Sequence, residues 1–166
     1  MGSGAVFFSG CALHCVFCQN ENIANGTAGK VISTERLGEI FLELQEKGAN
    51  NINLVTPGQF VPQIIKAVEL ARNQNLKIPI VYNTSSYENV DTIRSLEGIV
   101  DIYLPDFKYF DTALSAKYSH APDYPAVAKA VIAEMVRQTG AAVFENGEDS
   151  LMKRGTIVRH LILPGC

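Results

Sequence analysis

Short apolar runs alternate along this chain with longer segments in which apolar residues recur every three or four positions. The runs are four to seven residues long and end in residues that favour turns or loops. Runs of this kind are typical of buried strands, and the longer pattern is typical of amphipathic helices. Five strands are therefore predicted, over residues 5–8, 52–55, 78–82, 101–104 and 157–163.

Helices are predicted between these strands, because apolar residues there repeat with a period of about 3.6 residues. The first two helices have the clearest pattern, and Pro62 is tolerable in the first turn of the second. Asp123 is a candidate cap for the last helix. The predicted helices cover residues 33–48, 61–68, 88–96 and 124–138.

Strands that alternate with helices indicate right-handed βαβ units around a parallel sheet. Because no glycine-rich dinucleotide signature is present, we predict an α/β fold of the partial (β/α) barrel type, similar to a TIM barrel, with about five parallel strands and outer helices. Residues 141–156 contain Asn146-Gly147 and are expected to form a hairpin or a surface excursion. No repeat or linker divides the chain, so we expect one domain over residues 1–166.

Composition narrows the possible partners. The chain is 47% hydrophobic and has a net charge of −3, which argues against a nucleic-acid or anionic-membrane surface. No apolar run approaches the ~18 residues that a membrane span needs. The Met1-Gly2-Ser3-Gly4 start lacks the positive charge of a signal sequence. We therefore expect a cytoplasmic protein, in a reducing environment that suits thiolate ligands.

Three cysteines, Cys11, Cys15 and Cys18, fall within eight residues just after the first predicted strand. Three soft thiolates on one loop suit an iron–sulfur cluster in which one iron stays open. A zinc site with a histidine and a set of disulfides are the alternatives. Zinc sites usually pair two separated ligand couples, and His14 is expected to point away from the thiols. Cys166 is interpreted as a free thiol or as the mark of a truncation.

Catalytic groups of α/β barrels gather at the carboxyl ends of the strands. The segments at the ends of the predicted strands are rich in polar residues and glycine, so we expect them to share one rim. They are the cysteine loop and residues 56–59, 83–85, 106–108 and 164–165.

The cysteine spacing, with Phe17 before the last cysteine and Gln19-Asn20 after it, resembles the radical S-adenosylmethionine (SAM) superfamily. Four later segments, read in order, are similar to the pyruvate formate-lyase activating enzymes of that superfamily: residues 51–57, 81–85, 101–109 and 159–165. The resemblance covers nearly the whole chain. It implies a [4Fe-4S] cluster whose open iron binds SAM, and reductive cleavage of SAM to a 5′-deoxyadenosyl radical.

The resemblance also implies roles for single residues. Cys11, Cys15 and Cys18 match the cluster ligands, and Phe17 matches an aromatic residue near adenine. Thr56-Pro57-Gly58 stands in place of the family's Gly-Gly-Glu, which holds the methionine amino group. Because the glutamate is missing, Gly58 and nearby carbonyl groups would have to hold that amino group.

Further roles follow at the ends of the later strands. Asn83 and Ser85 match ribose and carboxylate contacts. Asp106 and Lys108 match an Asp-Leu-Lys segment, and Lys108 is a candidate catalytic residue. Arg159 matches an arginine suited to a carboxylate. An ordinary Asp106–Lys108 ion pair and a structural salt bridge of Arg159 are the alternatives.

Other histidines and tyrosines are interpreted as structural. His160 is expected to pack in the core and His120 to be exposed. Three tyrosines in or beside strands are expected to pack rather than to relay radicals. They are Tyr82, Tyr103 and Tyr109.

The resemblance implies a protein substrate, such as a glycyl-radical enzyme, and an electron donor such as flavodoxin or ferredoxin. Radical modification of another peptide or a small molecule is one alternative, and a non-catalytic fragment that binds SAM or only metal is another. Six-stranded members of the superfamily continue past the fifth strand. We therefore expect a fragment or a minimal version of that core, with an open barrel edge.

Overall fold

The computed structural model describes residues 2–145 and 150–163, which form a six-stranded sheet in the order β1-β2-β3-β4-β6-β5. Neighbouring strands from β1 to β6 are parallel, and only β5 is antiparallel to its neighbour within this sheet. The strands are β1 (Gly4–Phe7), β2 (Ile52–Val55), β3 (Ile80–Thr84), β4 (Ile102–Pro105), β5 (Val143–Phe144) and β6 (Met152–Thr156). The predicted α/β class and open partial barrel are confirmed.

Four helices cover one face of the sheet and close the main core. They are α2 (Thr34–Glu46), α3 (Val61–Asn73), α4 (Val90–Arg94) and α6 (Tyr124–Thr139). Phe41 of α2, Ile64 of α3, Ile93 of α4 and Met135 of α6 are fully buried in one cluster with the strands. The hydroxyl of Ser33 accepts a hydrogen bond from the Arg36 N–H and so caps α2.

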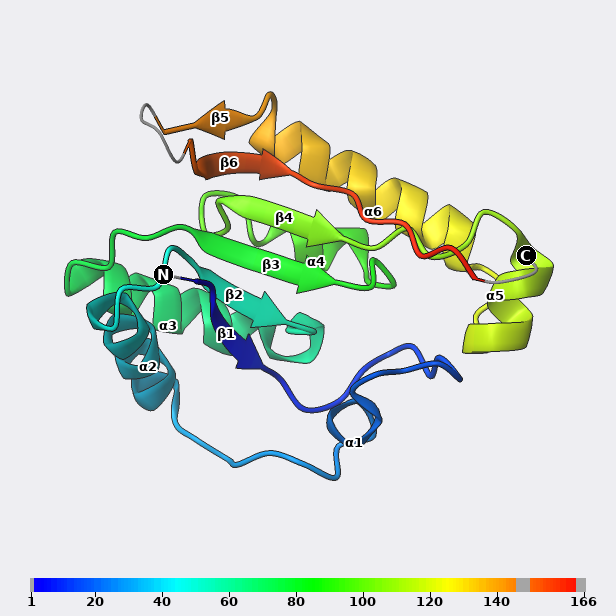
Figure 1. Ribbon diagram of the computed structural model, residues 1–166, viewed down its shortest axis with the longest axis horizontal. Helices are drawn as coiled ribbons and strands as arrows, with labels where there is room; N and C mark the ends of the chain where they lie inside the picture. Colours follow the sequence, from blue (N-terminus) through cyan, green and yellow to red (C-terminus); the bar gives the residue numbers. More distant parts are fainter. Residues whose placement is uncertain (1, 146–149, 164–166) are drawn as a thin grey trace.

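Shorter elements gather at the carboxyl ends of the strands. These are α1 (Glu21–Ala24), the single-turn 3₁₀ helix η1 (Gly58–Phe60) and α5 (Thr112–Ser119). Figure 1 shows the arrows of the parallel strands pointing toward the side of the molecule that carries the cysteine loop and α5. The predicted rim therefore exists as a structural feature.

The two faces of the sheet have different surroundings, because successive side chains of a strand point in opposite directions. Ile52, Leu54, Ile80, Tyr82 and Tyr103 pack toward the helices. The register partners Ala5, Asn53, Val81 and Ile102 share the opposite face. That second face is not covered by a helix layer, and it opens into the hollow described below.

The predicted last strand over residues 157–163 is wrong. The strand in this part of the chain is β6, which begins five residues earlier. Among the described residues after β6, only Arg159 forms a β-bridge, and its partner is Asp106. Residues 152–156 contain Lys153, Arg154 and Gly155, so they lack the apolar run that predicts a buried strand. Four apolar residues after β6 are exposed, namely Ile157, Val158, Leu161 and Ile162, and Ile162 is 80% exposed.

The expected hairpin in residues 141–156 is confirmed for its described part, because β5 and β6 pair in antiparallel fashion. Asn146-Gly147, Pro164-Gly165 and Cys166 lie outside the described residues. The pattern analysis missed α1 and α5. In the part of the chain that the structure covers, no helix has the length and apolar character that crossing a membrane requires.

Glu88 is a carboxylic acid packed against Gly58 of η1. Its carboxylate accepts hydrogen bonds from the Tyr82 hydroxyl at 2.6 Å and from the Thr84 hydroxyl. Burial raises the pKa of Glu88 above its ordinary value of 4.5, and the two hydroxyl donors act in the opposite direction. Between 4.5 and the raised pKa, the native state therefore binds more protons than the unfolded chain.

We predict that the contribution of Glu88 to the free energy of unfolding falls as the pH rises from 4.5 through the raised pKa, and that Glu88→Gln removes this contribution. Burial raises the pKa of Asp101 in the same direction, so part of the slope remains. Urea unfolding across this pH range measures the slope, with exposed Glu69→Gln as the matched control. An unchanged slope in Glu88→Gln would refute this role for Glu88.

Candidate active site

A hollow of about 780 Å³ lies at the carboxyl ends of the strands, a size suited to a small-molecule ligand. The cysteine loop, the ends of β2, β3 and β4, and the segment after β6 all contribute to its walls. Apart from Gly58, every residue that the sequence assigned to the site lines it. These residues are Cys11, Cys15, Phe17, Cys18, Thr56, Asn83, Ser85, Asp106, Lys108 and Arg159.

The cysteine loop is held in place by backbone contacts and one buried side chain. The Val16 N–H donates to the Tyr118 carbonyl of α5 at 2.9 Å, and the Cys18 N–H donates to the Cys15 carbonyl at 3.1 Å. Leu13 is 2% exposed and packs in a second cluster with Tyr109 and Tyr124. The loop is therefore anchored on α5 and α6 as well as on β1.

The three thiols share one electrostatic neighbourhood. Burial raises the pKa of the Cys11 thiol, negative charge on Cys15 and Cys18 adds to this effect, and the positive charge of Lys108 opposes it. All three cysteines are free, so the disulfide alternative is not realised. His14 is exposed, in agreement with the expectation that it points away.

The donor set fits an iron–sulfur cluster better than a single metal ion. Within residues 2–145 and 150–163, no three His, Cys, Asp or Glu side chains converge as the ligands of one ion must. Structural zinc needs four ligands around one point. The thiolates of a cluster instead bind different irons and stand further apart, which suits three cysteines that line the same hollow without converging on one point.

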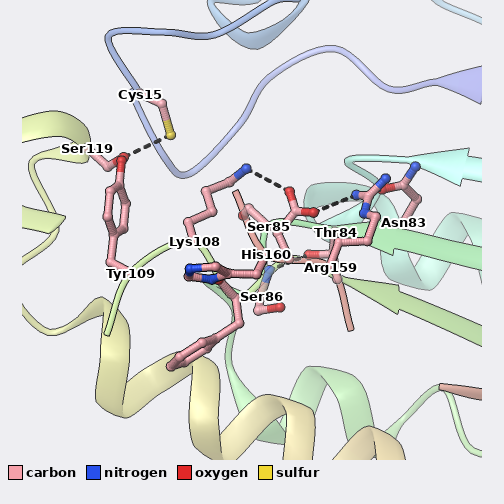
Figure 2. A network of polar contacts seen from close by, with 12 residues as sticks. Cys15, Asn83, Thr84, Ser85, Ser86, Lys108, Tyr109, Ser119, Arg159 and His160 are labelled. Atoms are coloured by element: carbon pink, nitrogen blue, oxygen red, sulfur yellow. Dashed lines mark hydrogen bonds and ion pairs between the residues drawn. The ribbon is translucent and has the colours of Figure 1, made fainter. Parts of the chain in front are cut away.

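Asp106 is the centre of a charged network that also lines the hollow. One of its oxygens lies 2.6 Å from the Lys108 ammonium, and the other lies 2.8 Å from the Arg159 guanidinium. Arg159 also donates to the Asn83 side-chain oxygen at 2.7 Å. Figure 2 shows Lys108, Arg159 and Asn83 around this network. Two cations share one carboxylate, so the network has a surplus positive charge that suits an anionic group of a ligand.

The segments that carry this network are tied together through the backbone. The Asp106 N–H donates to the Thr84 carbonyl at 2.8 Å, and the Phe107 N–H donates to the Arg159 carbonyl at 2.7 Å. The Arg159 N–H in turn donates to the Pro105 carbonyl. Asp106 and Lys108 therefore lie close together, as expected. They also form the ion pair that the alternative interpretation requires.

Tyr124, at the start of α6, supports the segments that carry this network, and no sequence pattern indicated this role. Its hydroxyl accepts a hydrogen bond from the Lys108 N–H at 2.8 Å. The carbonyl oxygens of Ser85 and Asp106 lie 2.9 and 2.8 Å from that hydroxyl as acceptors. Tyr124 is fully buried. One phenol thus connects the ends of β3 and β4 to the helix layer.

Tyr124→Phe is predicted to lower the free energy of unfolding by about 1–3 kcal/mol, because the Lys108 N–H loses its buried acceptor and the Ser85 and Asp106 carbonyl groups lose the one hydroxyl proton that they share. Urea unfolding measures this change. Tyr87→Phe is the matched control, since its hydroxyl bonds to Asp123 at an exposed site and its loss should cost less than about 0.5 kcal/mol. Equal losses in the two variants would contradict the supporting role of Tyr124.

Thr56 and Gly58 occupy different positions relative to the hollow. Thr56 lines it with a φ of 56°, a conformation that is strained for a β-branched residue and that clusters at functional sites. Gly58 lies in η1 instead, and a Cβ there would lie 2.9 Å from a Glu88 carboxylate oxygen. Gly58 is therefore close-packed against Glu88 and does not line the hollow.

Asn53 is a site residue for which sequence reasoning assigned no role. It lies on β2 and lines the hollow, and its side-chain oxygen is buried without a hydrogen-bond partner among the described residues. A single amide inside the apolar run 52–55 was the available signal. A buried unpaired acceptor of this kind is suited to a ligand donor.

The expectation that His160 packs in the core is wrong. His160 is exposed, and its ring is hydrogen-bonded to the Phe107 carbonyl. The centroids of the His160 and Phe107 rings are 6.5 Å apart. The physical reason is that residues after β6 form no strand with packed layers on both sides. His120 is exposed as expected. Tyr82, Tyr103 and Tyr109 are buried, as expected for packing residues.

Comparison with known proteins adds a family match. A family model described as the Radical SAM superfamily matches residues 5–140. An uncharacterized protein of Methanocaldococcus jannaschii is 25% identical over 169 residues, which cover 98% of this chain and 45% of that protein. The chain thus spans less than half the length of this curated relative.

Two solved structures share the fold at low sequence identity. Methylornithine synthase (PylB) superposes with a TM-score of 0.62 and 17% identity, covering 99% of this chain and 45% of that one. HydG, a maturase of the [FeFe]-hydrogenase, superposes with a TM-score of 0.59 and 14% identity, covering 80% of this chain and 32% of that one. At these identities, the likeness concerns the fold alone.

Proposed function

Because the chain belongs to the radical SAM superfamily, whose family model covers residues 5–140, we propose that it holds a [4Fe-4S] cluster and cleaves SAM reductively. Cys11, Cys15 and Cys18 would hold three of the irons. One observation carries this proposal: the three thiols and the Asp106 network line the same hollow. A metal-binding module without catalysis would not require that charged wall.

The roles of the other residues follow from the polarity of the hollow. Lys108 and Arg159 provide positive charge for the carboxylate of the methionine moiety, and Asp106 holds both cations in position. Asn83 and Ser85 offer polar groups for ribose, and Phe17 contributes near the adenine. Asn53 supplies the acceptor for a ligand donor deeper on β2. Leu13 and Val55 contribute apolar surface to the walls of the hollow.

When bound, the cluster supplies the electron that breaks the sulfonium bond, which gives methionine and a 5′-deoxyadenosyl radical. Lys108 and Arg159 would hold the methionine end of SAM, and Asn83, Ser85 and Phe17 its adenosine end. Flavodoxin or ferredoxin is the proposed class of electron donor.

We infer that the radical abstracts hydrogen from a protein target, and that a glycyl-radical enzyme is the first candidate. The order of the segments around Asn83, Asp106 and Arg159, which resembles the pyruvate formate-lyase activating enzymes, supports this choice. A different peptide or a small molecule is the alternative, and the missing Glu of the Gly-Gly-Glu segment is the feature that favours it.

The target can be tested directly. Reduced, cluster-loaded protein is incubated anaerobically with SAM and a glycyl-radical enzyme, and the radical is sought by electron paramagnetic resonance. The inferred activity produces a glycyl radical in that enzyme and none in its Gly→Ala variant. Formation of 5′-deoxyadenosine without any radical on the enzyme would exclude this target and leave the peptide or small-molecule alternative.

A further inference from the structure

Cys15 is engaged by a buried pair of hydroxyl groups outside the residues assigned above. The Ser119 hydroxyl, 104 residues away in the chain, donates a hydrogen bond to the Cys15 sulfur at 2.9 Å. The Tyr109 hydroxyl lies 2.7 Å from the same Ser119 oxygen. Figure 2 shows Ser119 between the Cys15 sulfur and the Tyr109 ring. Ser119 and Tyr109 are each 2% exposed.

The direction of both hydrogen bonds follows from counting protons. A cysteine that serves as a ligand is a thiolate, and a thiolate can only accept. A serine hydroxyl has a single proton. Ser119 donates this proton to Cys15, so its oxygen must accept a hydrogen bond from the Tyr109 hydroxyl. The three residues therefore form an ordered line from phenol to hydroxyl to sulfur.

Ser119 differs in this respect from Ser115, the other buried serine of α5. The Ser115 hydroxyl donates to the Thr112 carbonyl of its own helix, and the Thr139 hydroxyl in α6 bonds to the Met135 carbonyl and also lies 2.9 Å from the Thr156 hydroxyl of β6. Such local bonds are the usual choice for a helical Ser or Thr. Ser119 instead reaches out of α5 to the cysteine loop, which the Val16 to Tyr118 backbone bond holds against the end of α5.

We propose that Ser119, oriented by Tyr109, is a positioning residue that donates a hydrogen bond to the cluster thiolate of Cys15 and raises the reduction potential of the cluster. Reduction adds negative charge to the cluster and its sulfur ligands. A donor at one sulfur stabilises the reduced state more than the oxidised state, and hydrogen bonds to sulfur are among the factors that set such potentials. This inference rests on the proposed function, because it requires the cluster to form.

A redox titration of the reconstituted protein, followed by electron paramagnetic resonance, tests the proposal. Ser119→Ala should lower the equilibrium constant for one-electron reduction about tenfold, which moves the potential about 59 mV more negative. Tyr109→Phe should shift it less in the same direction, since Ser119 keeps its proton for the sulfur. Ser119→Thr retains a hydroxyl and should stay near the wild-type value. Ser115→Ala, in the same helix with an equally buried hydroxyl, is the matched control.

The outcomes separate this inference from the proposed function. A wild-type protein that takes up no cluster overturns both. Clusters of equal iron content and equal potential in wild type and Ser119→Ala overturn only the role of Ser119. If Ser119→Ala alone fails to load while Ser119→Thr loads, the hydroxyl is needed to position Cys15, which supports the proposal. If both Ser119 variants fail to load, the potential of Tyr109→Phe is the test. A more negative potential than wild type supports the proposal, and an unchanged or more positive one overturns it.

Discussion

Replacing Cys15 by alanine is expected to abolish the iron–sulfur cluster and all SAM cleavage. Three thiolates are the minimum set for a cluster with one open iron, and the described residues around Cys15 offer no substitute. His14 is exposed beside it, and Ser119 is a hydroxyl donor rather than a soft ligand. Removing Cys15 therefore leaves two anchors for an assembly that needs three.

Iron and sulfide analysis after anaerobic reconstitution measures this effect. The wild-type protein should bind about four irons per chain with a broad absorption band near ~400 nm, and Cys15→Ala should bind almost none. Cys166→Ala is the matched control, because it removes a cysteine outside the loop motif. Retention of a full cluster in Cys15→Ala, or its loss in Cys166→Ala, would contradict the assignment of ligands.

Asp106→Asn is expected to weaken SAM binding about tenfold to one hundredfold while the cluster stays intact. The carboxylate is the shared partner of Lys108 at 2.6 Å and Arg159 at 2.8 Å, so the neutral amide leaves both cations without their anchor. Hydrogen bonds to charged groups contribute about 1.5–3 kcal/mol each, which sets this range of affinity. Asp106 is not a ligand in the proposed cluster site, so iron content should not change.

Calorimetric titration of reconstituted protein with SAM measures the change, and Lys108→Met is the companion variant. Asp101→Asn is the matched control at the other end of β4: Asp101 pairs with Arg72 at 3.2 Å, and neither residue lines the hollow. That control should lose stability but keep its affinity for SAM. If Asp106→Asn and Lys108→Met both bind and cleave SAM as the wild type does, only the structural ion pair remains.

The rim of the sheet could be predicted because one physical rule brings its members together. The carboxyl ends of parallel strands lie at the same edge, so each segment that follows a strand contributes to one hollow. Asn83, Asp106 and the cysteine loop met there on this rule alone. Gly58 was the exception, because η1 turns it toward Glu88. The rule places segments correctly but does not determine which way each residue faces.

The parts that could not be predicted depend on contacts between distant segments. Tyr124 and Ser119 belong to helices, and nothing in the local pattern of α5 or α6 indicates that their hydroxyls reach the strand ends or the cysteine loop. The last strand was assigned to the apolar residues 157–163, whereas pairing with β4 on one side and β5 on the other selected the polar residues of β6. His160 is exposed for the same reason, because it lies after β6 and not within a strand.

The most direct test of the account is the yield of 5′-deoxyadenosine from the reconstituted protein. Cluster-loaded protein, reduced anaerobically in the presence of SAM, should release 5′-deoxyadenosine and methionine in equal amounts, and Cys15→Ala should release neither. A wild-type protein that carries a full cluster and binds SAM but forms no 5′-deoxyadenosine under reducing conditions would contradict the proposed radical chemistry.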